Sequence, residues 1–197
     1  MMNQATGASE TPSPERHYLY PGTLFVHRKP HLITTVLGSC VSVCLWNKTS
    51  QLGGINHYLL PLWNGEGLPT PKYGNIAISK LHEKVRAYSN PGDKLIAKVF
   101  GGASMWDKDK GDNFFCVGNV NSRFIQEFLG NEGIPLVTAD LEGDRGRVIY
   151  FSFGDFAVHV RKIQKTIGSN VVKRERKFWK SSIKAQKRQE IKPEIWS

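Results

Sequence analysis

Cysteine is scarce in this sequence, and long apolar runs are missing. The 197 residues include three cysteines, Cys40, Cys44 and Cys116, an odd number that argues against a disulfide framework and for a reducing compartment. No stretch approaches the roughly 20 apolar residues that span a bilayer, so no transmembrane helix is expected. The first residues lack the basic and apolar segments of a secretory signal. We therefore expect a cytoplasmic protein whose thiols remain available for chemistry.

Positive charge is concentrated near the C-terminal end. Residues 1–160 contain 15 lysines and arginines against 14 acidic residues, whereas residues 161–197 contain 12 against 3. The body is thus nearly neutral, which argues against nucleic acid as its ligand. We predict a disordered leader over residues 1–16, a single folded domain over 17–165 and a basic extension over 166–197.

Strand-like and helix-like patterns alternate along the predicted domain. Apolar residues at helical spacing predict a helix over residues 75–88 and a second one starting at 116–118, with Asn121 or Ser122 as its cap. Residues rich in β-branched and aromatic side chains predict strands in the segments 18–25, 33–47, 53–61, 95–103, 135–143 and 147–163. These elements predict a mixed α/β domain in which two helices pack against mainly antiparallel sheets.

One cysteine and one histidine form a candidate catalytic pair. Gly38 and Ser39 precede Cys40 and would let a substrate carbonyl approach the backbone amides there. His57 follows 17 residues later. If the segments 33–47 and 53–61 pair as a hairpin, both side chains can reach one face and one end, where the histidine could deprotonate the thiol. From spacing alone, a buried cysteine and a satisfied strand histidine are the more common interpretation of such a pair.

Two other groups of residues give only weak signals for a metal site and for a phosphate-binding loop. Cys40, Cys44, His57 and Cys116 could be imagined as zinc ligands, but two cysteines separated by three residues inside an alternating strand make a poor metal loop. The sequence Gly-Gly-Ala-Ser at 101–104 lacks the Lys-Ser/Thr ending of a phosphate-binding loop. We therefore expect neither a metal nor another cofactor.

Four longer segments together resemble the CheD family of chemoreceptor glutamine deamidases. They are TTVLGSCVSVCLWN (34–47), GGINHYLLP (53–61), KVFGGASMW (98–106) and PLVTADLEGDRGRVIYFSFGDFAVHVRKI (135–163). The resemblance covers roughly residues 18–165 and implies a single-domain α/β/β layered sandwich.

The same resemblance implies site residues. It implies Cys40 as nucleophile, His57 as base and the threonine six positions before the cysteine, Thr34, as the third member, with Thr35 one register step away. It further implies that substrate or the oxyanion is held around Gly38, Ser39, Gly101, Gly102 and Ser104.

The implied activity is hydrolysis of glutamine side chains in the cytoplasmic region of a chemoreceptor. A thiolate would attack the carboxamide, ammonia would leave, and water would release glutamate from a thioester. Glutamate methyl esters could be cleaved by the same route. The family also implies binding of a CheC-type response-regulator phosphatase, so a regulatory binding module is the alternative function. The presence of Cys40, His57 and Thr34 favours catalysis.

The basic extension leaves several interpretations open. Within residues 171–197, Val172, Trp179 and Ile183 fall on one helical stripe among many basic residues. Such a segment suits an anionic membrane surface near receptor arrays, an acidic partner or nucleic acid. A solvated extension is an equally good interpretation.

Overall fold

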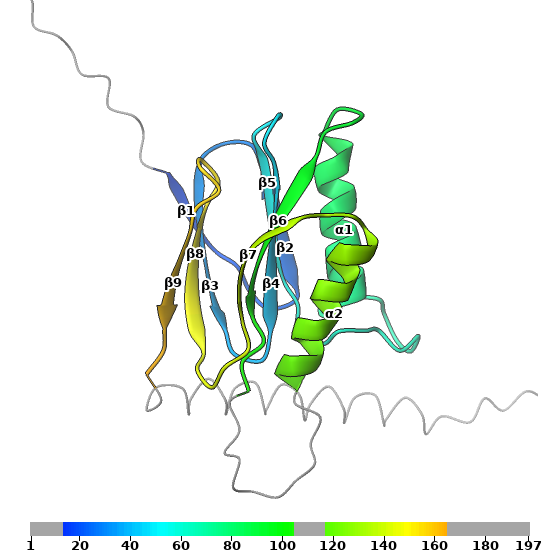
Figure 1. The fold of residues 1–197 in the computed structure, drawn as a ribbon, viewed down its shortest axis with the longest axis vertical. Helices are drawn as coiled ribbons and strands as arrows, with labels where there is room; N and C mark the ends of the chain where they lie inside the picture. The colour runs from blue at the N-terminus through cyan, green and yellow to red at the C-terminus, as the bar shows by residue number, and fades with distance from the viewer. Residues whose placement is uncertain (1–13, 105–116, 165–197) are drawn as a thin grey trace, which may run out of the picture.

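The computed structural model describes residues 14–104 and 117–164, which form a three-layered α/β/β sandwich (Figure 1). The elements in chain order are β1 Glu15–Tyr18, β2 Thr23–His27, β3 His31–Leu37, β4 Val41–Asn47, β5 Leu52–His57, α1 Gly74–Ala87, β6 Leu95–Gly101, α2 Val117–Asn131, β7 Leu136–Leu141, β8 Arg147–Ser152 and β9 Val158–Lys162. The predicted leader, Cys116 and the basic extension lie outside the described residues, except that β1 begins at Glu15, inside the expected leader.

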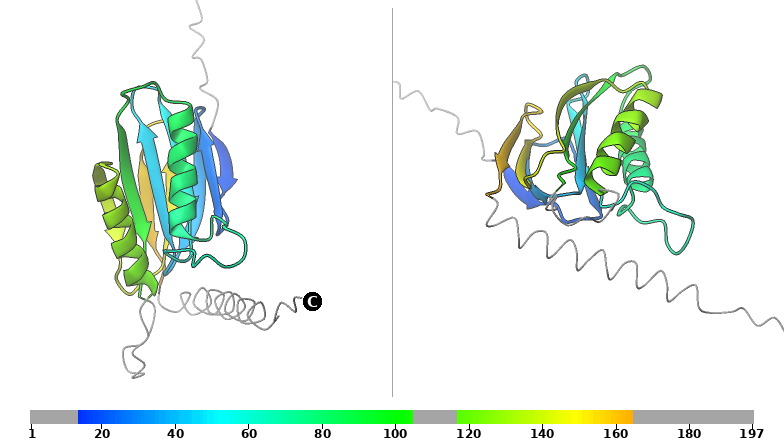
Figure 2. Two further views of the ribbon diagram at one scale, coloured as in Figure 1. Left: turned by 90° about the vertical axis from the view of Figure 1, so that its right-hand side faces the viewer. Right: turned by 60° about the horizontal axis from the view of Figure 1, so that its bottom comes forward.

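Two sheets pack face to face. The four-stranded sheet has the order β1-β3-β8-β9, and the five-stranded sheet has the order β2-β5-β4-β6-β7. Only β1–β3 and β6–β7 pair in parallel; the other pairs are antiparallel. Both helices cover the free face of the five-stranded sheet (Figure 2). The expected single-domain α/β/β sandwich with two helices and mainly antiparallel sheets is thus confirmed.

Strand β4 separates two apolar cores. Val41, Val43 and Leu45 pack toward the helices, where they meet Ile78, Leu81 and other residues of α1 and α2. Cys40 and Cys44 face the other way and pack between the sheets. Because strand side chains alternate between faces, a central strand covered on both sides has no solvent-exposed face, and all seven residues of β4 are buried.

The helices begin and end close to where the pattern predicted, with one error. Helix α1 spans 74–87 against the predicted 75–88, and α2 ends at Asn131. The predicted cap of α2 is wrong, because Asn121 and Ser122 lie inside the helix and are completely buried. Neither helix of the described ranges is long and apolar enough to cross a membrane.

The chain passes from one sheet to the other at four connections, β1–β2, β2–β3, β3–β4 and β7–β8. Segment 33–47 was expected to be one strand bent near Gly38, but it divides into β3 of the four-stranded sheet and β4 of the five-stranded sheet. The Pro21-Gly22 turn likewise separates β1 from β2, which join different sheets. The turn at Gly38–Cys40 therefore lies where the two sheets meet.

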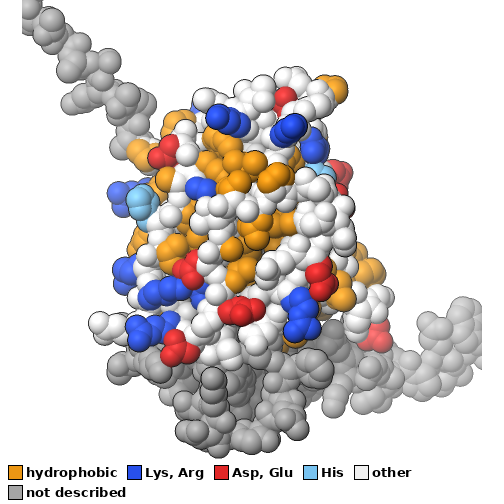
Figure 3. Space-filling model, in the orientation of Figure 1, with side chains coloured by type: hydrophobic (Ala, Val, Ile, Leu, Met, Phe, Trp, Pro, Cys, Tyr) orange, Lys and Arg blue, Asp and Glu red, His pale blue; other side chains and the backbone are white. Residues whose placement is uncertain are grey.

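Apolar side chains are exposed at one edge of the sandwich. Leu136 and Val137 of the edge strand β7 are 36% and 49% exposed. Figure 3 shows apolar side chains gathered over the middle of the face on which Figure 1 draws β7, with charged side chains around them. Leu136 pairs with Ala97, whereas Gly101, at the other end of β6, pairs with Val41 beside the Gly38–Cys40 turn.

Candidate active site

The turn that carries Cys40 is held from behind by the end of β6. The Gly102 amide donates a hydrogen bond to the Cys40 carbonyl at 2.8 Å, and the Ala103 amide donates to the Gly38 carbonyl at 2.7 Å. Gly101 has a φ of +121°, and a Cβ there would lie 2.1 Å from the Cys40 carbonyl oxygen. Only glycine fits this close approach of the two backbones. Cys40 itself is 3% exposed.

These contacts change the interpretation of the Gly101–Ser104 segment. The amides of Gly102 and Ser104 donate to Cys40 and to Gly143, so both are engaged within the protein. Gly101 and Gly102 therefore support the Gly38–Cys40 turn, whereas Ser104 bonds to Gly143. That these residues hold the substrate or the oxyanion stays a prediction. Gly38 and Ser39 lie in the turn itself, as the sequence predicted.

The predicted hairpin brings Cys40 and His57 to one face. Strands β4 and β5 pair antiparallel, and the ladder ends with a bridge between Val41 and Tyr58. Cys40 and His57 each immediately precede one member of that bridge, so they are diagonal neighbours, for which the separation is typically about 7–8 Å and somewhat less between Cβ atoms. An imidazole and a thiol can span that separation. Both residues are buried.

The hydroxyl of Thr35 determines which nitrogen of His57 carries hydrogen. Thr35 Oγ1 donates to the Leu19 carbonyl at 2.8 Å and lies 2.9 Å from His57 Nδ1. A carbonyl only accepts, and a hydroxyl has one hydrogen, so Nδ1 must donate to Thr35. The other nitrogen, Nε2, then carries the lone pair. It is buried and has no hydrogen-bond partner among residues 14–104 and 117–164, so its lone pair is available to accept a proton.

The structure places Thr35, and not Thr34, against the histidine. Residues of β3 alternate in burial, with Ile33, Thr35 and Leu37 buried and Thr34 only partly buried. A shift of one residue in a strand moves a side chain to the opposite face. Counting six positions back from Cys40 therefore selects the outward-facing threonine. In the structure, the threonine in contact with His57 is Thr35, one residue after the predicted Thr34.

Burial sets the protonation of the groups around the site. Burial lowers the pKa of His57 to about 4, opposed by the nearby Leu19 carbonyl, so the imidazole is neutral at pH 7. Burial raises the pKa of Cys44 far above its ordinary value, opposed by Lys98, so Cys44 stays a neutral thiol. Burial also raises the pKa of Tyr58, and the nearby Cys40 raises it further. A neutral imidazole on the face shared with Cys40 has a lone pair that can accept a proton, and its lowered pKa makes it a weak base.

Sequence reasoning missed Asn121 as a residue of this site. Its Nδ2 donates to the carbonyls of Ser39 and Leu59, and its backbone carbonyl accepts from the Tyr58 hydroxyl. The available signal was an asparagine at an inward position of an amphipathic helix, where a buried amide needs partners.

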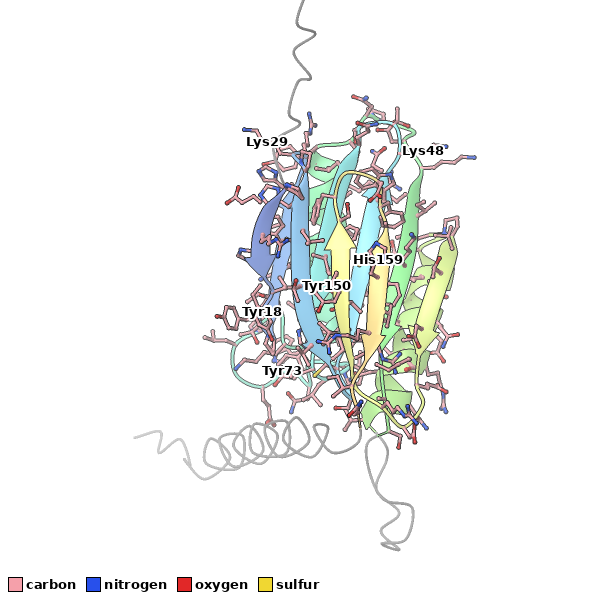
Figure 4. All side chains as sticks on the ribbon, turned by 90° about the vertical axis from the view of Figure 1, so that its left-hand side faces the viewer. Tyr18, Lys29, Lys48, Tyr73, Tyr150 and His159 are labelled. Carbon is pink, nitrogen blue, oxygen red and sulfur yellow. The ribbon has the colours of Figure 1, made fainter. Side chains whose placement is uncertain are left out.

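The site lies at one end of the sandwich. Leu60, three residues after His57, forms a bridge with Tyr73, and Figure 4 shows Tyr73 at the end opposite Lys29 and Lys48. Cys40 and Cys44 are both thiols. Across residues 14–104 and 117–164, no group of three or more histidine, cysteine or acidic side chains is arranged to hold a metal ion.

Comparison with known proteins shows which family this chain resembles. The model of the family described as CheD chemotactic sensory transduction matches residues 59–162. A protein of Sulfurimonas denitrificans named "Probable chemoreceptor glutamine deamidase CheD" is 45% identical over 152 residues, covering 77% of this chain and 97% of the relative. A Geobacter sulfurreducens protein, "Probable chemoreceptor glutamine deamidase CheD 1", is 40% identical over 89% of this chain and 91% of its own. By these matches, which cover most of its length, the chain belongs to the CheD family.

Proposed function

We propose that this protein is a protein-glutamine glutaminase that converts glutamine side chains of a chemoreceptor to glutamate. The observation that carries the proposal is the orientation of His57, whose Nδ1 is held by Thr35 while Nε2 remains without a partner on the face shared with Cys40. The names of the relatives support glutamine as the group attacked and a chemoreceptor as the substrate.

The first half of the reaction forms a thioester. His57 Nε2 takes the proton from Cys40, and Sγ attacks the carboxamide carbon of glutamine. Backbone amides of the Gly38–Cys40 turn stabilise the oxyanion. The C–N bond breaks as His57 returns the proton to nitrogen, and ammonia leaves.

The second half uses water. His57 Nε2 takes a proton from water, whose oxygen attacks the thioester carbon, and the C–S bond breaks to give glutamate and the thiol. Thr35 keeps the imidazole in the required tautomer through both halves, as the third member of a triad does. A glutamate methyl ester has an equivalent carbonyl, so the same site can release methanol from it.

The decisive test compares Cys40→Ala with the matched variant Cys44→Ala. Cys40 immediately precedes β4 and Cys44 lies within it, and both are buried between the sheets, so the two changes remove similar buried groups. We expect Cys40→Ala to release no ammonia from a receptor cytoplasmic fragment and to produce no glutamine-to-glutamate mass change. Cys44→Ala should retain turnover, apart from a packing loss of stability.

Turnover by folded Cys40→Ala protein would refute the mechanism, and loss of turnover in folded Cys44→Ala or Cys116→Ala would identify a different thiol. Binding of a CheC-type phosphatase is a separate proposal. It is tested by whether Cys40→Ala protein still co-elutes with that partner.

A further inference from the structure

One buried side chain of α2 contacts the backbone on both sides of the catalytic pair. Asn121 Nδ2 donates to the Ser39 carbonyl at 2.9 Å and to the Leu59 carbonyl at 3.0 Å. Ser39 immediately precedes Cys40, and Leu59 follows His57 by two residues. Asn121 is completely buried. A single amide group therefore joins the nucleophile turn to the histidine strand.

The surroundings hold this amide in place. The Tyr58 hydroxyl donates to the backbone carbonyl of Asn121 at 2.8 Å, in the buried space between α2 and the sheet. One turn earlier, Gly118 lets α2 approach Gly102 and Ala103 closely, because a Cβ at Gly118 would lie 2.5 Å from the Gly102 carbonyl oxygen. Asparagine is a poor helix former, and its buried amide is costly unless it is bonded. Its Nδ2 satisfies two carbonyls, whereas its buried Oδ1 has no hydrogen-bond partner among the described residues.

The bond to Ser39 has a consequence for Cys40. The described chain has no cis peptide bonds, so the Ser39–Cys40 peptide is planar and trans, and its carbonyl and its N–H point in opposite directions. A side chain that holds the Ser39 carbonyl therefore also fixes the direction of the Cys40 amide beside Sγ. Preorganised backbone donors stabilise the oxyanion that forms when a thiolate attacks a carbonyl.

We propose that Asn121 is a positioning residue for carbonyl attack at Cys40. It orients the backbone of the nucleophile turn, whereas Thr35 and His57 set the protonation of the thiol. The proposal rests on the proposed nucleophilic role of Cys40. Loss of Asn121 should therefore slow reactions that pass through an oxyanion and spare reactions of the same thiol that do not.

Two small reagents separate these steps. With iodoacetamide, Sγ bonds to a saturated carbon and iodide leaves, so no oxyanion forms. With p-nitrophenyl acetate, Sγ attacks the carbonyl carbon, 4-nitrophenolate leaves and an acetyl thioester remains on Cys40. For Asn121→Ala we expect acylation to slow by about 10–100-fold, in keeping with the loss of an oxyanion contact, and alkylation to change by less than about threefold.

The controls use neighbouring residues. Ser122→Ala alters an equally buried polar residue of the same helix and should leave both rates near those of the wild type. Cys40→Ala measures the background from the remaining thiols. If Asn121→Ala does not fold, Asn121→Asp replaces it, because aspartate keeps the shape and lacks the amide donors.

Each outcome decides the inference. Equal slowing of acylation and alkylation would show that Asn121 only maintains the fold, and unchanged acylation would show that it does not position the turn; either overturns the proposal. Wild-type protein that is not acylated at Cys40 overturns it as well. If the wild type is acylated and shows the expected difference but never deamidates a receptor fragment, the inference stands and the proposed function fails.

Discussion

At the scale of single residues, the face of a strand decides which of two adjacent threonines can take part in the chemistry. Thr35 lies between the sheets and bonds both His57 and Leu19, whereas Thr34 contributes its backbone carbonyl to the Leu19 amide. Both side chains are β-branched and suit a strand equally well. The two threonines therefore differ in the face of β3 from which their side chains project. Removing each hydroxyl separately tests whether this difference matters.

We predict that Thr35→Val lowers kcat on a receptor fragment by about 10–100-fold and that the matched variant Thr34→Val stays within about threefold. Valine keeps the branched shape and removes the hydroxyl, so Thr35→Val leaves Nδ1 of His57 without its acceptor. The buried groups left unpaired should also lower the free energy of unfolding by about 1–3 kcal/mol. Steady-state rates and urea unfolding measure the two effects. The reverse pattern would restore Thr34 to the site.

At the scale of elements, the first turns of α2 pack closely against the backbone of Gly102 and Ala103. Gly118 faces the carbonyls of Gly102 and Ala103, and Asn121 reaches the Ser39 carbonyl from the next turn. The other end of the helix has no such requirement, since nothing lies within 4 Å of a Cβ built at Gly130. The two glycines provide an internal comparison within one helix.

We predict that Gly118→Ala lowers turnover and destabilises the fold by about 1–3 kcal/mol, because its methyl group would meet backbone atoms that cannot easily move. Gly130→Ala should stabilise the fold by about 0.5–1 kcal/mol, because alanine is the better helix former and the space is open. Urea unfolding and deamidation rates of both variants measure this. A stable, fully active Gly118→Ala protein would show that the close approach of α2 is unnecessary.

At the scale of the whole molecule, the buried histidine makes the free energy of unfolding depend on pH. Its pKa falls from 6.5 to about 4 on folding, so between these pH values the unfolded chain binds a proton that the folded protein does not. The free energy of unfolding therefore rises with pH across this window, by up to about 3 kcal/mol from His57. Above pH 6.5 the contribution is complete.

We predict that His57→Asn, which keeps an amide donor for Thr35, removes this part of the pH dependence. The free energy of unfolding of the wild type minus that of the variant should be larger at pH 7 than at pH 4.5. Urea unfolding at the two pH values measures the difference. His82, whose pKa is also lowered by burial, is present in both proteins and cancels. A difference that does not change with pH would contradict the predicted titration.

The basic extension gives a prediction about location in the cell. We propose that deletion of residues 171–197 leaves turnover on a soluble receptor fragment unchanged and weakens binding to anionic vesicles. Each basic residue near such a surface contributes about 1 kcal/mol, an attraction that salt screens. Vesicle co-sedimentation across a salt series measures it. Equal sedimentation of both proteins would support a solvated extension, and loss of turnover would place the extension in the folded domain.

The sequence by itself predicted both helices, the hairpin and Cys40 with His57 as the candidate pair. Periodicity located both helices and the hairpin, and the cysteine and histidine were recognised because local chemistry and family resemblance do not depend on long-range packing. Only the tertiary structure decided that the chain changes sheets at Gly38, that Thr35 faces His57 and that Asn121 joins the two segments. A local pattern shows that strand side chains alternate, but which face becomes the interior depends on the sheet that the strand joins. That choice is made by contacts between residues far apart in the chain.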